Sequence, residues 1–151
     1  MNAVKVKGRF FHAPDILGFQ PIGGLQDGPN MAWDRRLWIR LAALSGLISV
    51  AAGAFAAHGV ADPAAKDWLR TGANYQAIHA LAVLAVAALF PAGARRAGWP
   101  PALFLLGSLL FSGSLYAMAL GGPRWLGAVT PLGGLLFLAG WATLAWAAGE
   151  A

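Results

Sequence analysis

The chain alternates long runs of apolar residues with short polar connections. Four of these runs carry almost no formal charge, and they occupy residues 38–57, 75–90, 102–120 and 129–148. A bilayer core of about 30 Å needs roughly 17 to 25 apolar residues per helix. Each run reaches this length once a residue or two of interfacial flank is counted, so the pattern predicts four membrane-spanning helices.

The connections between the runs indicate how these helices follow one another. Residues 91–101 start with Pro91 and end with Pro100 and Pro101, while residues 121–125 open with two glycines. Such short, breaker-rich connections reverse the chain quickly and make successive helices antiparallel neighbours. We therefore expect an all-α integral membrane four-helix bundle with up-down-up-down topology, formed by residues 34–151.

The connection after the first run carries a helix-start signal. Asp62 is followed by Pro63, the order that suits an N-cap and the first helical position. Trp68 and Leu69 then supply an apolar side. We expect a short interfacial helix between spans one and two, which lies along the membrane surface and bends at Gly72 into span two.

Composition agrees with a membrane protein. The chain is 58% hydrophobic and 11% charged, with a formal net charge of +5, whereas soluble domains average about 25% charged residues. The arginines nearest the runs flank them and form no basic face with interleaved aromatic residues: Arg35, Arg36, Arg40, Arg95 and Arg96. We expect the lipid bilayer as the surroundings of the chain and no nucleic-acid partner.

The same charges predict the orientation in the membrane, because cytoplasmic loops hold the excess of Lys and Arg. The arginines named above lie on one side, with Lys5, Lys7 and Arg9 further out, whereas the other side holds Lys66, Arg70 and Arg124. The sequence therefore predicts a multi-pass protein of the bacterial inner (plasma) membrane with both termini in the cytoplasm.

The first part of the chain differs from the rest. Residues 1–33 have mixed polarity and no sustained period, so we expect a disordered cytoplasmic leader, with Met31 as a candidate true start. A rival interpretation makes the first run a signal peptide that is cleaved at the A-x-A-like site Ala54-Phe55-Ala56. We favour a retained first span, because the cleaved product would still cross the membrane three times.

Small residues recur at helical spacing inside the runs. The positions are Ser45, Ser49, Gly53 and Ala57 in the first run, Ser108 and Ser112 in the third, and Gly133 and Gly140 in the fourth. Such stripes let helix backbones approach closely. They predict either packing within one bundle or a face for a homo-oligomer.

Five blocks of sequence carry a family resemblance. They are residues 53–59 (GAFAAHG), 71–81 (TGANYQAIHAL), 111–116 (FSGSLY), 130–134 (TPLGG) and 139–141 (AGW). In this order they resemble the signature of domain-of-unknown-function family 423, a small four-span group that includes proteins similar to transmembrane protein 256. The resemblance implies the four-span fold and no established activity. The leader before Met31 departs from the family pattern, as does Ala56, where the family commonly has glycine.

Polar residues gather on the predicted non-cytoplasmic half of the spans. This candidate polar cluster comprises His58, Asn74, Tyr75, Gln76, His79, Ser112, Tyr116 and Thr130. Ionisable groups at membrane depth are functional candidates by default, which makes His79 the strongest of them. It lies about 6 Å inside the predicted span at 1.5 Å per residue, where it needs a partner such as Tyr116, Ser112 or a backbone carbonyl. We consider three roles for it: an interhelical hydrogen bond that fixes register, ligand binding or proton handling, and metal binding.

The spans lack the residues that catalysis requires. None of the four runs contains Asp, Glu, Lys or Cys, so they hold no carboxylate pair and no activated nucleophile. We therefore expect no enzyme, no catalytic or metal-binding residue and no cofactor. The remaining interpretation is a structural or accessory membrane protein that acts through helix packing, as a homo-oligomer or with a protein partner. The alternative is a small transporter or channel subunit that uses the His/Tyr/Ser cluster as its pathway.

Overall fold

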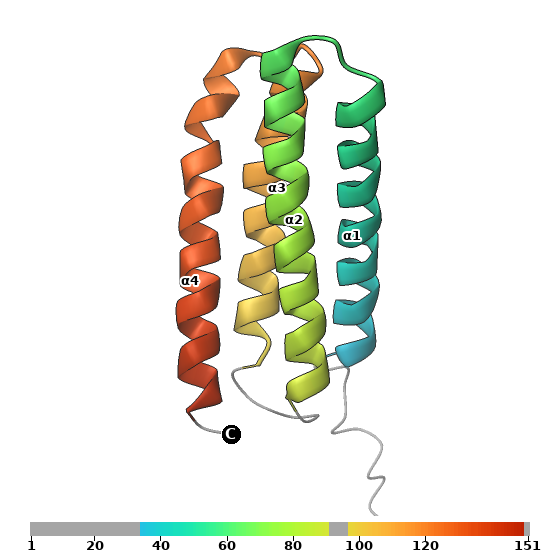
Figure 1. The fold of residues 1–151 in the computed structure, drawn as a ribbon. Helices are drawn as coiled ribbons and strands as arrows, with labels where there is room; N and C mark the ends of the chain where they lie inside the picture. The colour runs from blue at the N-terminus through green and yellow to red at the C-terminus, as the bar shows by residue number, and fades with distance from the viewer. Residues whose placement is uncertain (1–33, 91–96, 150–151) are drawn as a thin grey trace, which may run out of the picture. The chain divides into compact units, whose positions relative to one another are not determined.

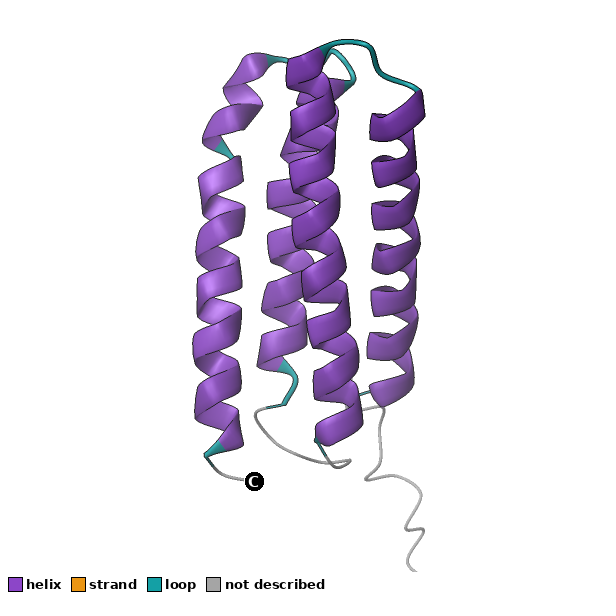
Figure 2. Ribbon diagram, in the orientation of Figure 1, coloured by secondary structure: helices purple, strands orange, loops and turns teal. Residues whose placement is uncertain are grey.

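The computed structural model describes residues 34–90 and 97–149, and within them the chain is helical without a strand (Figure 2). Four long helices follow in order: α1 (Arg35–His58), α2 (Pro63–Leu89), α3 (Trp99–Ala119) and α4 (Thr130–Ala148). A short 3-10 helix, η3 (Arg124–Ala128), precedes α4. The helices belong to one compact unit, Met31–Ala151. The leader 1–33, the Met31 start, Arg95 and Arg96 fall outside the described residues, so what the sequence predicts for them stays a prediction.

Every helix is long and apolar enough to cross a membrane, counting η3 with α4. Successive helices run in opposite directions, and the start of α1 lies at the same end of the bundle as the end of α4 (Figure 1). The prediction of an all-α, four-span, up-down-up-down bundle is therefore confirmed. We call the opposite end, where α1 finishes and α4 begins, the η3 end.

The helices pack as a row of neighbours, with α2 and α3 in the middle. α1 packs on α2, α2 on α3, and α3 on α4, while α1 and α4 lie on opposite flanks (Figure 1). Burial follows this order, since 50% of the most apolar window of α2 is buried inside the bundle but only 17% of that of α4. The flanking helices thus present most of their apolar surface to lipid.

The prediction of a separate interfacial helix is wrong. Asp62 does cap a helix, because its Oδ2 accepts a hydrogen bond of 2.8 Å from the backbone N–H of Ala65, and Pro63 is the first helical residue. That helix, however, continues through Gly72 to Leu89 without a break. A Cβ at position 72 would come within 2.6 Å of the Tyr116 ring, so this glycine serves close contact with α3 and no bend. The short element missed by the sequence analysis is η3.

The stripes of small residues turn inward. A Cβ at Gly140 would meet the Phe104 ring at 2.5 Å, and one at Gly133 would clash with the Phe111 backbone. Gly107, which lies outside the predicted stripes, is packed as closely, since a Cβ there would meet the Phe137 ring at 2.6 Å. Of the small residues in the predicted stripes, only Ala57 is exposed. These stripes therefore serve packing within the bundle, where they bring α3 and α4 together over a core that includes Phe104 and Phe137.

Candidate functional site

A hydrogen-bonded chain of side chains connects three helices through Gln76 on α2. The Nε2 of Gln76 donates to Ser45 Oγ on α1 at 3.2 Å, and its Oε1 accepts from the hydroxyl of Tyr116 on α3 at 2.8 Å. Gln76 is 7% exposed, so both bonds are largely shielded from lipid and water. The amide therefore fixes the register of α2 against both neighbours.

Two serines add contacts of a second kind, from side chain to backbone. Ser49 on α1 donates to the carbonyl of Ala73 at 2.9 Å, and Ser112 on α3 donates to the carbonyl of Gly72 at 2.8 Å. A carbonyl oxygen has two lone pairs, so each can accept this bond as well as the one within its helix. Such bonds require close approach of the helices, which the small residues here permit.

His79 forms a separate site between α2 and α4. Its Nδ1 lies 2.7 Å from the carbonyl oxygen of Tyr75, and the indole Nε1–H of Trp141 donates to its Nε2 at 3.3 Å. Because an indole N–H can only donate, Nε2 must accept, which places the ring proton on Nδ1 and leaves the imidazole neutral. The ring also stacks on Phe137, with centroids 3.5 Å apart and planes inclined by 4°.

These contacts confirm one expectation for His79 and correct another. Of the expected partners, the structure shows the backbone carbonyl, while Tyr116 and Ser112 bond to Gln76 and Gly72. The expected depth is wrong: His79 lies sixteen residues after Pro63, about 24 Å along α2 at 1.5 Å per residue, because α2 starts well before the predicted span. Its partner Trp141 lies near the middle of α4, so His79 lies near mid-span.

The other members of the candidate polar cluster are dispersed. His58 is exposed at the end of α1, and Asn74 is exposed on α2. Tyr75 is 45% exposed and packs its ring against Phe111 at 4.7 Å. Thr130 Oγ1 lies 2.8 Å from Ser114 Oγ and connects α4 to α3. Within the predicted cluster, the structure thus pairs Gln76 with Tyr116, and His79 with the backbone carbonyl of Tyr75. Ser112 bonds to the Gly72 backbone instead, so the whole set does not form one cluster.

The sequence analysis missed several participants. Ser45 and Ser49 entered it only as small packing residues, and Trp141 only as part of a family block. The spacing of the two serines, one helical turn apart, could have indicated a polar face on α1 toward Gln76. Nothing in the sequence marks Trp141 as the donor to His79, because that pair depends on how α4 is rotated.

Nearly all buried polar side-chain atoms of the described residues have a hydrogen-bond partner. Among residues 34–90 and 97–149, the only buried side-chain nitrogen or oxygen without a hydrogen-bond partner is Trp38 Nε1. The same residues contain no group of three or more His, Cys, Asp or Glu that could hold a metal ion. Apart from Trp38 Nε1, the buried polar side-chain atoms of these residues are hydrogen-bonded to one another or to the backbone.

Fold and site together define a small four-span membrane protein whose interior is secured by hydrogen bonds. The model of the family "Protein of unknown function (DUF423)" matches residues 52–134, and the chain belongs to this family. The resemblance described above is thereby confirmed.

Several curated relatives are similar to the chain, and each alignment covers 72% of it. A UPF0382 membrane protein of Haemophilus influenzae is 46% identical over 112 residues, 90% of its length. The UPF0382 inner membrane protein YgdD of Escherichia coli K12 is 44% identical over 116 residues, 86% of its length. The UPF0382 membrane protein SH2409 of Staphylococcus haemolyticus is 40% identical over 112 residues, 92% of its length.

No solved structure matches the chain significantly. The chain is thus a multi-pass protein of the bacterial inner membrane, from a family without an assigned biochemical function.

Proposed function

We propose that this protein is a non-enzymatic accessory protein that acts by lateral packing against another protein of the inner membrane. The observation that carries the proposal is that the buried polar side chains form hydrogen bonds with one another and with the backbone. Gln76 satisfies Ser45 and Tyr116, and His79 is engaged on both ring nitrogens. Polar groups that line a transport pathway face a water-filled cavity, whereas these face one another.

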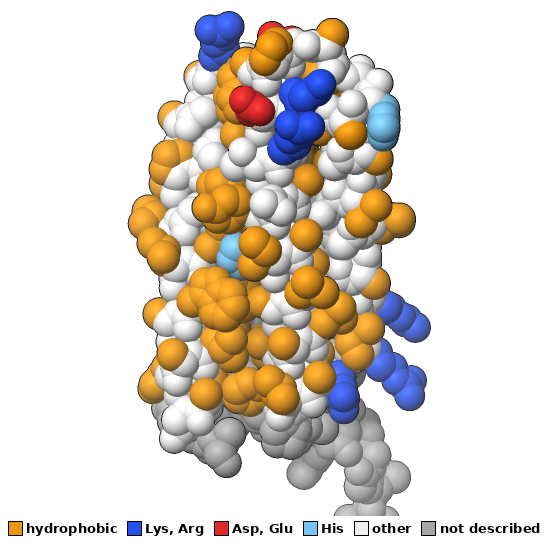
Figure 3. Space-filling model, in the orientation of Figure 1, with side chains coloured by type: hydrophobic (Ala, Val, Ile, Leu, Met, Phe, Trp, Pro, Cys, Tyr) orange, Lys and Arg blue, Asp and Glu red, His pale blue; other side chains and the backbone are white. Residues whose placement is uncertain are grey.

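The lipid-facing surface supports the same proposal. Large apolar side chains cover the outer faces of α1 and α4; among them Leu47 is 66% and Leu138 is 68% exposed. On the face shown in Figure 3, Lys and Arg lie toward the two ends of the bundle, with an apolar band between them. Such a band suits contact with lipid and with apolar faces of other membrane proteins.

A photo-crosslinking scan tests lateral packing directly. A photoreactive residue placed at Leu47, Leu109 or Leu138 samples α1, α3 and α4 from highly exposed positions. In native membranes we expect a discrete adduct of one mass from one of these faces, and lipid-sized adducts from the others. Lipid adducts from all three positions would contradict the proposal.

A flux assay separates this function from transport. In proteoliposomes, we expect ion and proton flux no higher than in protein-free vesicles. Flux that rises with the protein and changes in Gln76→Leu would establish a pathway through the polar interior and overturn the accessory role.

We further infer that both termini of the bundle face the cytoplasm. Arg35, Arg36 and Arg40 lie at the end where α1 begins and α4 finishes, and the connection at residues 91–96 adds two arginines to the same side by sequence. The η3 end carries both signs of charge, with Asp62 and Asp67 beside its basic residues. An excess of positive charge on the cytoplasmic side is the usual arrangement.

Cysteine labelling tests this orientation cleanly, because the chain has no cysteine of its own. Ala61→Cys places a thiol between α1 and α2, and Gly149→Cys places one after α4. In spheroplasts we expect a membrane-impermeant maleimide to label the first variant and spare the second until the membrane is opened. The reverse pattern would invert the topology.

A further inference from the structure

A groove runs between α2 and α4. It encloses about 750 Å³, and its body is lined by rings and branched apolar side chains that include Ile78, Phe111, Leu135, Leu138 and Trp141. Ile78, Leu135 and Leu138 are at least half exposed. Since α2 and α4 cross the membrane, the groove opens toward the hydrocarbon of the bilayer.

The end of the groove nearer η3 is polar. Asn74 and Tyr75 line it, and both are exposed. The Tyr75 ring rests on Phe111, whereas its hydroxyl and the Asn74 amide form no hydrogen bond with any other residue in 34–90 and 97–149. Unpaired polar groups beside hydrocarbon are unfavourable, so this end favours an occupant that offers hydrogen-bonding atoms.

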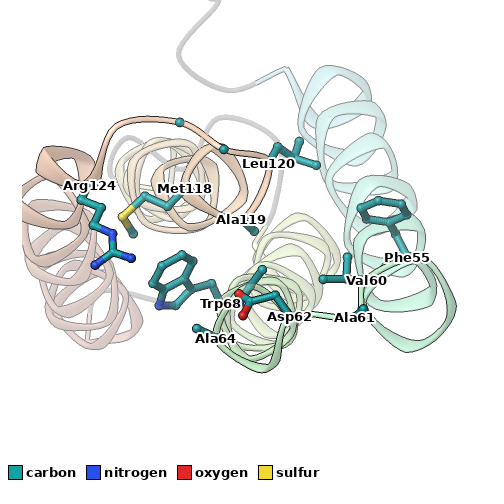
Figure 4. Close-up of a pocket in the computed structure, with 14 residues that line it drawn as sticks. Phe55, Val60, Ala61, Asp62, Ala64, Trp68, Met118, Ala119, Leu120 and Arg124 are labelled. Atoms are coloured by element: carbon teal, nitrogen blue, oxygen red, sulfur yellow. Dashed lines mark hydrogen bonds between the residues drawn. The ribbon is translucent and has the colours of Figure 1, made fainter.

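A basic side chain lies above that polar end. Arg124 of η3 and Trp68 of α2 line a second cavity, of about 700 Å³, and their side chains turn toward each other (Figure 4). Trp68 precedes Tyr75 by seven residues, about 10 Å and two full turns along one face of α2. Arg124 forms no ion pair with a carboxylate among the described residues, and the nearby Asp62 is engaged as the cap of α2.

From the η3 end toward the middle of the bundle, these features are a cation, hydrogen-bonding groups and an apolar groove, in two cavities that share no lining residue. The order matches the parts of a phospholipid. We propose that the surface from Arg124 to Trp141 binds one anionic phospholipid, its phosphate on Arg124, its glycerol esters near Asn74 and Tyr75, and one acyl chain in the groove. This goes beyond the accessory role and does not depend on it.

Charge selects an anionic headgroup over a zwitterionic one. Beside Arg124, the η3 end carries Lys66 and Arg70 against Asp62 and Asp67, which leaves one positive charge in excess. A phosphatidylethanolamine would bring an ammonium group into this surplus, whereas a phosphatidylglycerol brings only negative charge. We therefore expect preference for phosphatidylglycerol.

Native mass spectrometry of the full chain tests the headgroup contact. The protein is reconstituted in equal amounts of phosphatidylglycerol and phosphatidylethanolamine with identical acyl chains, then released in mild detergent. We expect one retained phosphatidylglycerol, and about tenfold weaker retention in Arg124→Gln, because a hydrogen bond to a charged group is lost. Arg40→Gln is the matched control: it removes the same charge from an exposed position at the opposite end of the bundle, where α1 begins, and should retain the lipid.

A second pair of variants tests the groove itself. Gly134 lines the groove, and a Cβ there meets nothing within 4 Å. Gly134→Leu should fill the space and abolish retention, while Gly113→Leu, equally free of contacts but on α3 outside the groove, should not. Equal retention in both glycine variants, or equal retention of the two lipids, would overturn the proposal. So would a dimer in the wild type that only Gly134→Leu dissociates, because the groove would then be a self-association face.

Discussion

Replacing Gln76 by leucine is the sharpest test of the hydrogen-bonded interior. The substitution keeps the side-chain volume nearly constant but removes the bonds to Ser45 and Tyr116. Interhelical hydrogen bonds in membranes contribute about 0.6 kcal/mol on average and about 1.7 at most. Leaving the Tyr116 hydroxyl without a partner costs about 1–3 kcal/mol more where it stays shielded. We therefore expect Gln76→Leu to lower the free energy of unfolding by about 2–4 kcal/mol.

The assay is unfolding by SDS from mild detergent micelles, followed by tryptophan fluorescence. Asn74→Leu is the control, since it removes an amide from an exposed position of α2 that has no hydrogen bond, and it should leave stability unchanged or raise it. Adding Tyr116→Phe to Gln76→Leu should recover part of the loss, because the orphaned hydroxyl disappears. The reasoning would be refuted by a Gln76→Leu variant as stable as the wild type. It would also be refuted by a double variant with a lower free energy of unfolding than Gln76→Leu alone.

Two further predictions use the same assay. Gly72→Ala should cost about 1–3 kcal/mol, because its Cβ would press on the Tyr116 ring at 2.6 Å, while Gly113→Ala, whose Cβ meets nothing within 4 Å, should be neutral or gain up to about 1 kcal/mol in helix propensity. Equal stability of the two would contradict the close contact of α2 and α3. His79→Ala should cost about 2–4 kcal/mol, since it leaves a cavity in the ring stack. Trp141→Phe should cost less, about 1–2 kcal/mol, because it loses one long hydrogen bond and leaves His79 Nε2 without a donor. Similar losses in both would show that the Trp141 bond, and not the buried ring, holds His79.

The spans are predictable from sequence because the length of an apolar run is a local property. The start of α2 is not. Its first two turns carry Asp67 and Arg70 among apolar residues, and this pattern fits equally a helix on the membrane surface and one that stands upright. The contact of Gly72 with Tyr116 decides between them, and it exists only once α3 is in place.

The candidate site shows the same division. That Gln76, Ser112 and Tyr116 occupy one half of the spans follows from topology alone. Which of them pair depends on the rotation of each helix about its axis, which apolar runs without a polar face do not specify. His79 illustrates the consequence: besides the Tyr75 carbonyl, it pairs with Trp141 on α4, which the sequence did not suggest as a partner.

The two flanks of α2 differ in the size of the side chains that meet there. Toward α1, Ser49 bonds directly to the backbone of Ala73, and the cavity beside this contact holds only about 380 Å³. Toward α4, the rings of His79, Phe137 and Trp141 meet instead, and the groove there is about twice as large, near 750 Å³. Serine and alanine let two backbones close on each other, whereas stacked rings hold them apart. The groove between α2 and α4 therefore arises because the side chains that meet on this side of α2 are aromatic. On the side that faces α1 they are small, and the two helices come closer together.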